Sequence, residues 1–153
     1  MADATLESLG LARKPVVTVK ATDPCLKAFD LMSKHKLSGL AVTTASGGVL
    51  CSISAADVRF MVNIDKFDLV GMDVISFVST CRQMDSTRMD KTMAPMVAVS
   101  PTTTIRNVVG KLAATHLHRL YVVDKTDLCG VVSLKDLLYA LLVGTKPAAA
   151  TAE

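Results

Sequence analysis

The stretch Val19-Lys20-Ala21-Thr22-Asp23-Pro24-Cys25-Leu26 decides the fold, because the chain repeats its pattern 80 residues later. The second version reads Val99-Ser100-Pro101-Thr102-Thr103-Thr104-Ile105-Arg106. The register continues as Leu37-Ser38-Gly39-Leu40 against Leu117-His118-Arg119-Leu120. After a one-residue loop deletion it resumes as Ile53–Val58 against Val132–Leu137. A repeat this long indicates two copies of one supersecondary unit.

Each copy is predicted to contain a strand, a helix, two strands and a second helix. In the first copy, Thr22-Asp23-Pro24 is a helix start, with a capping side chain and then a proline that needs no hydrogen-bond acceptor. Gly47-Gly48 is a turn between strands. The expected elements are strand 16–19, a helix with Cys25, Ala28, Phe29 and Met32 on one face, strands 40–43 and 49–53, and helix 55–62.

The second copy repeats this order. The expected elements are strand 96–99, a helix capped by Thr103 or Thr104 with Ile105, Val108, Val109 and Leu112 on one face, strands 120–123 and 130–132, and helix 134–143. Gly144 and Pro147 end the last helix.

These elements divide the chain into five parts. The first is a lead-in over residues 1–14, whose Leu6, Leu9 and Leu11 can pack on the domain. Repeat 1 spans 15–63 and repeat 2 spans 93–144. Between them lies a linker, 64–92, with a helical pattern of Val74, Phe77, Val78 and Cys81. Residues 145–153 are expected to form a flexible tail.

The composition excludes several classes of function. Lys and Arg exceed Asp and Glu by three and are scattered, and aromatic residues make up only 4% of the chain. A nucleic-acid groove with stacking platforms is therefore not expected. The charge-free stretch 37–56 is interrupted by Ser46-Gly47-Gly48, so it predicts two strands and not a membrane span. A mean hydropathy of +0.41 with only 20% charged residues points to self-association.

The cysteines and the N-terminal residues indicate the compartment. Cys25, Cys51, Cys81 and Cys129 are not spaced like a zinc or redox motif and lie among apolar neighbours. They are interpreted as buried, reduced thiols. Asp3 and Glu7 interrupt the N-terminal residues, which resemble neither a secretory signal nor a transit peptide. The expected location is the cytoplasm.

Two Ser-x-x-Asp sequences each follow a predicted strand and open a helix. Ser54-Ala55-Ala56-Asp57 does so in the first copy and Ser133-Leu134-Lys135-Asp136 in the second. The simpler interpretation is a helix-capping box. A carboxylate in that first turn can also accept both hydroxyls of a ribose, because its two oxygens match a vicinal diol. The motif alone leaves both interpretations open.

A cationic pair precedes a strand of the second copy. Arg119 can bind a phosphate through two parallel hydrogen bonds, and His118 can add another. The simpler interpretation is a solvated Arg119 paired with Asp124 or Asp127. A metal between His116 and His118 is disfavoured because no third ligand is suitably spaced. No GxSxG, HExxH, P-loop or GxGxxG sequence is present, so an enzyme is not expected.

These residues together resemble the CBS domain, and the two copies resemble a CBS pair, or Bateman module, over residues 12–144. The segments 118–124 and 130–136 are similar to the last CBS repeat of AMP-activated protein kinase gamma subunits. The resemblance implies an α/β fold of tandem βαββα repeats packed with pseudo-two-fold symmetry. It also implies regulatory binding of AMP, ADP or ATP without catalysis, and no required cofactor or metal.

The resemblance also implies which residues bind the nucleotide. Asp136 would hold the ribose beside Ser133, and His118 and Arg119 would meet the phosphate next to Leu117. The adenine would lie on Met96 and Val97, with Thr92 just upstream. A second, weaker site would use Val16, Val17, Ser38, Gly39, Ser54 and Asp57.

The first copy departs from this pattern. Ser38-Gly39 replaces His118-Arg119, and Cys51 stands where the second copy has Gly130. The first copy therefore lacks a phosphate-binding pair, and its site would bind adenosine weakly, an uncharged ligand, or nothing. The chain has two repeats whereas the kinase gamma subunit has four, so it is not a complete gamma subunit.

The favoured function is a nucleotide-sensing regulatory module, and the alternative is a ligand-free interaction module in which Asp57 and Asp136 only cap helices. A helix apolar on nearly every side should be buried on several sides. Residues 134–143 are such a helix, and 55–62 are a shorter one. A homodimer built on them is expected, and the resemblance points the same way. A kinase or another regulated enzyme is the further partner, without nucleic acid or membrane.

Overall fold

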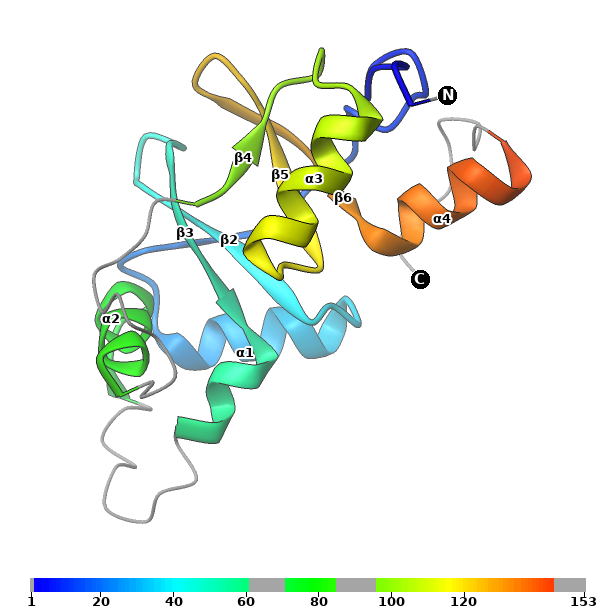
Figure 1. The fold of residues 1–153 in the computed structure, drawn as a ribbon. Helices are drawn as coiled ribbons and strands as arrows, with labels where there is room; N and C mark the ends of the chain where they lie inside the picture. Colours follow the sequence, from blue (N-terminus) through cyan, green and yellow to red (C-terminus); the bar gives the residue numbers. More distant parts are fainter. Residues whose placement is uncertain (1, 61–70, 85–95, 145–153) are drawn as a thin grey trace. The chain divides into compact units, whose positions relative to one another are not determined.

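The structure, a computed structural model, describes residues 2–60, 71–84 and 96–144 (Figure 1). It has the mixed α/β architecture predicted from the repeat, with two three-stranded sheets ordered β1-β2-β3 and β4-β5-β6. The first copy contains β1 (Thr18–Lys20), α1 (Cys25–Lys34), β2 (Gly39–Thr43), β3 (Val49–Ser54) and the 3-10 helix η1 (Ala55–Phe60), and α2 (Val74–Met84) follows it in the segment between the copies. The second contains β4 (Ala98–Val99), α3 (Ile105–Thr115), β5 (Arg119–Asp124), β6 (Asp127–Ser133) and α4 (Leu134–Val143).

The strand registers confirm that the two copies share one fold. The first and second strands of each copy are parallel, with Thr18 opposite Ala41 and Ala98 opposite Tyr121, pairs related by the 80-residue step. The helix between them is the crossover that a parallel pair requires. The second and third strands are antiparallel, and each pair shifts register at the same place, after Val42 and after Val122.

The described residues form two compact units. The first unit comprises residues 17–60, 71–84 and 96; the second unit comprises residues 2–16 and 97–144. Each unit contains one of the two sheets and its own hydrophobic core.

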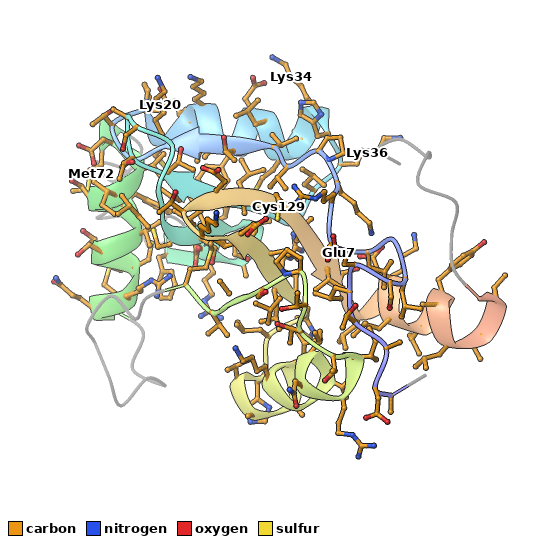
Figure 2. The ribbon with its side chains drawn as sticks, turned by 90° about the horizontal axis from the view of Figure 1, so that it is seen from above. Glu7, Lys20, Lys34, Lys36, Met72 and Cys129 are labelled. Carbon is orange, nitrogen blue, oxygen red and sulfur yellow. The ribbon has the colours of Figure 1, made fainter. Side chains whose placement is uncertain are left out.

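The core of the first unit includes the helix that was predicted within 64–92. Val74, Phe77, Val78 and Cys81 of α2 are all buried among residues from β1, α1, β2 and β3. The backbone N–H of Cys25 donates to the carbonyl of Met72 (3.0 Å), so α1 and α2 begin side by side, near the residue labelled Met72 in Figure 2. Helix α2 is therefore a structural part of the first unit.

The core of the second unit includes the N-terminal segment, defined here as residues 2–16. Leu6 and Leu11 are buried with α3, β5, β6 and α4, and Leu9 packs against them, as the sequence predicted. The backbone of the segment bonds to the start of α3, where Ile105 N–H donates to the carbonyl of Ala4 (2.9 Å). This segment therefore completes the core of the copy that lies farther from it in sequence.

Glycine at position 130 is explained by the N-terminal segment. A Cβ at Gly130 would lie 2.2 Å from the carbonyl oxygen of Ala12, which is closer than real Cβ atoms approach. The backbone N–H of Lys14 donates to the carbonyl of Cys129 (3.1 Å), which holds the segment along β6. Only glycine permits this approach.

Three local predictions are corrected. Pro24 is the N-cap of α1 and supplies no side-chain cap, because the Asp23 carboxylate accepts instead from the backbone N–H of Lys20 (3.0 Å). The helix expected over 55–62 is the 3-10 helix η1, which is described only to Phe60. The first strands begin two residues later than expected, at Thr18 and Ala98. Thr104, one of the two expected caps, accepts from Asn107 N–H and caps α3.

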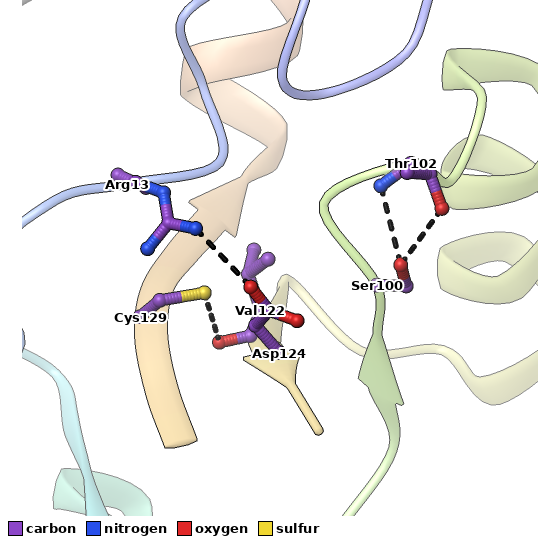
Figure 3. A network of polar contacts seen from close by, with 6 residues as sticks. All are labelled: Arg13, Ser100, Thr102, Val122, Asp124 and Cys129. Carbon is purple, nitrogen blue, oxygen red and sulfur yellow. Dashed lines mark hydrogen bonds and ion pairs between the residues drawn. The ribbon is translucent and has the colours of Figure 1, made fainter. Parts of the chain in front are cut away.

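The thiols of Cys25, Cys51 and Cys81 are free and buried, as predicted. Burial raises the pKa of Cys25 to about 11 and that of Cys81 to about 12, which keeps both protonated. Cys129 differs because it is only half-buried, and its thiol donates to the Val122 carbonyl (3.3 Å; Figure 3).

Candidate ligand-binding site

The start of α4 forms the capping box that its sequence predicted. The backbone N–H of Asp136 donates to Ser133 Oγ (3.3 Å), and the backbone N–H of Ser133 donates to Asp136 Oδ2 (2.9 Å). The Ser133 hydroxyl also donates to the same Oδ2 (2.7 Å). The capping interpretation is therefore correct, and it fixes the Asp136 carboxylate at the junction of β6 and α4.

The cationic pair lies on the strand next to this carboxylate. Arg119 is the first residue of β5 and stands opposite Ser133 in the antiparallel register. The carbonyl of His118 accepts from the backbone N–H of Leu134, the first residue of α4 (3.1 Å). Residues 118 and 119 and the Ser-x-x-Asp motif are thus brought together at one end of the second sheet, as the sequence suggested.

The N-terminal segment brings a cation to the same carboxylate. Lys14 Nζ lies 2.6 Å from Asp136 Oδ1, and both side chains are mostly buried, with 32% and 27% of their surface exposed. Its neighbour Arg13 makes a more exposed pair with Asp124 at 3.1 Å, which Figure 3 shows. The pairing of Lys14 with Asp136 was not predicted. The one sequence signal for a segment docked on this strand was Gly130 where the first copy has Cys51.

The Asp136 carboxyl is ionised at neutral pH. Burial acts to raise its pKa, but the hydrogen bonds from Lys14 and from the side chain and backbone of Ser133 outweigh that effect, so the net pKa lies below the ordinary value. An ionised carboxylate has about four acceptor positions. Ser133 uses both acceptor positions of Oδ2, and Lys14 uses one of Oδ1. About one acceptor position on Oδ1 therefore remains for a ligand.

The first copy repeats the backbone arrangement and the carboxylate, but Ser38 and Gly39 replace the cationic pair. Gly39 stands opposite Ser54, and Ala55 N–H donates to the Ser38 carbonyl (3.0 Å). Ser54 N–H donates to Asp57 Oδ2 (2.8 Å), as Ser133 does to Asp136. The Ser54 hydroxyl accepts from Ala56 N–H (3.2 Å), one residue earlier than in a capping box. This difference accompanies the 3-10 geometry of η1.

The remaining predicted site residues are distributed between the units. Leu117 is exposed at 38% beside His118. Val97 packs against the second core, and Val17 packs against the first. Met96 belongs to the first unit and Val16 to the second. Thr92, like the predicted tail 145–153, lies outside the described residues.

Helix α4 presents a large apolar surface in the second unit. Only Leu137 and Ala140 are buried in it. Leu142 is 81% exposed and Val143 68%, and the other exposed apolar residues are Leu134, Leu138, Tyr139 and Leu141. The prediction that this helix is apolar on several sides is correct, and one side alone is covered within the described chain.

The described residues contain neither a metal-binding cluster nor a membrane-spanning helix. No three His, Cys, Asp or Glu side chains there are grouped to hold a metal ion. Among the same residues, every helix is too short or too polar to cross a bilayer.

Comparison with known proteins identifies the repeat. The sequence model of the CBS domain matches residues 7–64 and 89–143. Protein SDS23 of Phaeosphaeria nodorum is 30% identical over 119 residues, which are 78% of this chain and 22% of that protein. Protein SDS23 of Podospora anserina is 26% identical over 147 residues, 96% of this chain and 29% of the relative. The chain thus spans about a quarter of the length of these relatives.

Solved structures share the fold. CBSX2 in complex with AMP superposes with a TM-score of 0.66 and 22% identity, over 88% of this chain and 95% of that one. The CBS domain of a bacterial CNNM/CorC family Mg²⁺ transporter in complex with ATP gives 0.69 and 17% identity, over 95% and 91%. A CBS-domain protein of Agrobacterium tumefaciens gives 0.69 and 20% identity, over 92% and 95%.

Proposed function

The chain belongs to the CBS domain family, and from this premise we propose that it is a regulatory module that binds an adenosine nucleotide without catalysing a reaction. AMP, ADP and ATP are the candidate ligands, since CBSX2 binds AMP and the CNNM/CorC CBS domain binds ATP. The proposed site lies in the second unit. The nucleotide would act as a regulatory ligand, so no permanently bound cofactor is required, and the regulated partner would be a kinase or another enzyme.

One observation carries this proposal. A fixed carboxylate, Asp136, lies at the start of α4. Arg119 is the first residue of the adjacent strand β5, and His118 immediately precedes it. A nucleotide presents a diol and a phosphate, which need an acceptor and a cationic donor respectively. The two kinds of group therefore lie at one end of one sheet, as recognition of a nucleotide requires.

Titration calorimetry with AMP tests the role of Asp136. Replacing Asp136 by Ala removes a charge-assisted hydrogen bond to the ribose, worth about 1.5–3 kcal/mol, so affinity should fall tenfold or more. Asp30→Ala is the control, because it removes an exposed carboxylate of α1 that is paired with Lys34 and belongs to neither proposed site. Equal AMP affinity in the wild type and Asp136→Ala would remove the ribose role.

A second titration tests the phosphate role of Arg119. Arg119→Ala should lower the affinity for AMP tenfold or more and leave the affinity for adenosine nearly unchanged. Only AMP has the phosphate that two guanidinium N–H groups can bind. Arg106→Ala is the control, since Arg106 is an exposed cation of the same unit that faces Asp3. A similar loss for both ligands would show that Arg119 has a structural role.

The proposed site of the first unit is the weaker one. Its Asp57 can hold a ribose, but Ser38 and Gly39 offer no cationic side chain for a phosphate. Val17 and Ser54 would complete this site. We therefore expect adenosine and AMP to bind there with similar, low affinity.

The exposed face of α4 favours a second function, self-association through this helix. Exposing several leucines of one helix to water is unfavourable. A second copy of the chain offers a complementary apolar face that would bury them. Sedimentation at micromolar concentration should show a dimer. Its presence alone would be compatible with the ligand-free alternative, so the AMP titrations decide between the two.

A pair of leucine variants tests the surface. Leu138 of α4 and Leu26 of α1 are almost equally exposed, at 57% and 56%. Leu138→Glu should split the dimer, because an unpaired carboxylate is costly in an apolar interface, while Leu26→Glu should leave it intact. A wild-type chain that stays monomeric with and without AMP would contradict self-association.

A further inference from the structure

Lys14 holds a fixed position beside the carboxylate that the proposed function assigns to the ribose. Its backbone N–H donates to the Cys129 carbonyl on β6, and Ala12, two residues earlier, is buried against Gly130. Its ammonium lies 2.6 Å from Asp136 Oδ1. Within the described part of the chain, Asp136 is the one partner of Lys14 Nζ. An ammonium has three N–H donors, so two remain for a ligand.

A ligand that reaches Asp136 must also meet this ammonium. Oδ2 already accepts two hydrogen bonds from Ser133, so the position left for a ligand is on Oδ1, the oxygen that Lys14 contacts. A hydroxyl group bound to Oδ1 as a donor has lone pairs that can accept from Nζ. A phosphate is less suitable at this point, because the adjacent carboxylate would repel it.

We propose that Lys14 is a second ribose-binding side chain, which donates to the oxygen of a ribose hydroxyl while that hydroxyl donates to Asp136. This inference rests on the proposed function, since it needs a ribonucleotide in the second unit. The ammonium–carboxylate pair is matched by a group that is both donor and acceptor. A hydroxyl is such a group, and the C–H of a deoxyribose is not.

Two other roles of the Lys14–Asp136 pair predict different results. If Lys14 only stabilised the fold, removing it would weaken AMP and its deoxy analogues equally. If Lys14 competed with the ligand for Asp136, removing it would strengthen binding of all of them. A direct bond to a hydroxyl predicts a loss confined to ligands that carry that hydroxyl.

The experiment compares AMP, 2′-deoxy-AMP and 3′-deoxy-AMP by titration calorimetry on the full chain. Wild type should prefer AMP to at least one deoxy analogue by tenfold or more. Lys14→Met should bind AMP about tenfold more weakly, and should bind the analogue that lacks the contacted hydroxyl within twofold of wild type. Arg13→Met is the matched control, because Arg13 is the next residue and its partner is the exposed Asp124.

Two further variants keep the result interpretable. Lys14→Arg retains a charged donor and should recover part of the preference for AMP. Lys14→Gln retains an uncharged donor and replaces Lys14→Met if thermal melting shows that Met at this position prevents folding. Equal losses for all three nucleotides, or unchanged AMP affinity, would overturn the inference alone. A wild-type chain that binds none of them would overturn the proposed function.

Discussion

At the scale of single residues, Asp136 is the point where three parts of the second unit meet. Ser133 connects it to β6, its own backbone begins α4, and Lys14 connects it to the N-terminal segment. A carboxylate with so many donors is held in its charged form and in one orientation. Both properties favour a ligand that donates hydrogen bonds, and both contribute to stability.

The Lys14–Asp136 pair should make stability depend on pH in a defined direction. The folded pKa of Asp136 is lowered, so the contribution is fully present above the unfolded pKa, about 3.9, and is lost as pH falls through the folded pKa. Lys14→Met should therefore cost about 1 kcal/mol at pH 7, and the difference from wild type should shrink below about pH 4. Urea unfolding at both pH values measures it.

The control for this measurement is again Arg13→Met. Arg13 and Asp124 are 64% and 46% exposed, so solvent screens their attraction and the loss should be smaller. A difference between Lys14→Met and wild type that stays constant from pH 7 to pH 3 would show that the variant acts through packing and not through the charge of Asp136.

Gly130 should be intolerant of even a methyl group. Gly130→Ala places a Cβ 2.2 Å from the Ala12 carbonyl oxygen, and relieving this contact must move backbone. The free energy of unfolding should fall by roughly 1–3 kcal/mol. Gly110→Ala is the control, because nothing lies within 4 Å of its Cβ and it occupies α3, where alanine should stabilise by up to about 1 kcal/mol. Equal effects of the two changes would contradict the close approach.

At the scale of elements, the two Ser-x-x-Asp motifs begin helices of different kinds. The motif at Ser133 completes a capping box on the ten-residue helix α4, whereas the motif at Ser54 precedes the 3-10 helix η1, which buries none of its residues. The same four-residue pattern therefore stabilises the two helices to different extents. The difference lies in the packing that follows, since α4 buries Leu137 and Ala140.

Serine substitutions should reveal this difference. Ser133→Ala removes the acceptor of the Asp136 N–H and a donor to its carboxylate, so it should cost about 1 kcal/mol of unfolding free energy. Ser54→Ala removes the acceptor of the Ala56 N–H and a long hydrogen bond to the Ser38 carbonyl (3.4 Å), at a helix with no buried residue, and should cost less. Thermal or urea unfolding of both variants measures the costs. A larger loss for Ser54→Ala would contradict the assignment of the capping box to α4.

The sequence predicts elements well where periodicity and register are local. The first helix of each repeat and the helical pattern of Val74, Phe77, Val78 and Cys81 follow from apolar spacing, and the structure buries that spacing. Val109 is an exception, because it was expected on the apolar face of α3 and is 44% exposed. The strand-to-helix position of Ser133 and its proximity to Arg119 follow from hairpin pairing. Pro24 was assigned the wrong cap position because the Asp23 carboxylate binds the preceding turn instead.

The contacts that sequence could not predict join distant parts of the chain. Lys14 and Asp136 are 122 positions apart, and no local pattern connects them. Leu6, Leu9 and Leu11 show that the segment can pack, but their spacing does not specify against which repeat. That choice depends on backbone bonds to the start of α3 and on the space left by Gly130.

At the scale of the whole molecule, the second unit is built from two segments that the first unit separates in sequence. The second unit takes its first residues from the N-terminus, ahead of the entire first unit in sequence. Its sheet, its core and its candidate site therefore depend on a segment that an isolated second repeat would lack. The first unit has a core of its own, built from α1, α2 and the sheet β1-β2-β3.

Truncation of Leu6 should therefore destabilise the second unit selectively. Leu6 is fully buried in the second core, and Leu6→Ala should cost about 2–5 kcal/mol there. Amide hydrogen exchange should accelerate in β5, β6 and α3 and change little in β2, β3 and α1, because these belong to the first core. Leu26→Ala is the control, since Leu26 is 56% exposed on α1. Faster exchange in α1 and β2 alone would contradict the packing of the N-terminal segment with the second unit. Leu6→Ala should also lower the affinity for AMP, because loosening the N-terminal segment releases Lys14 from Asp136.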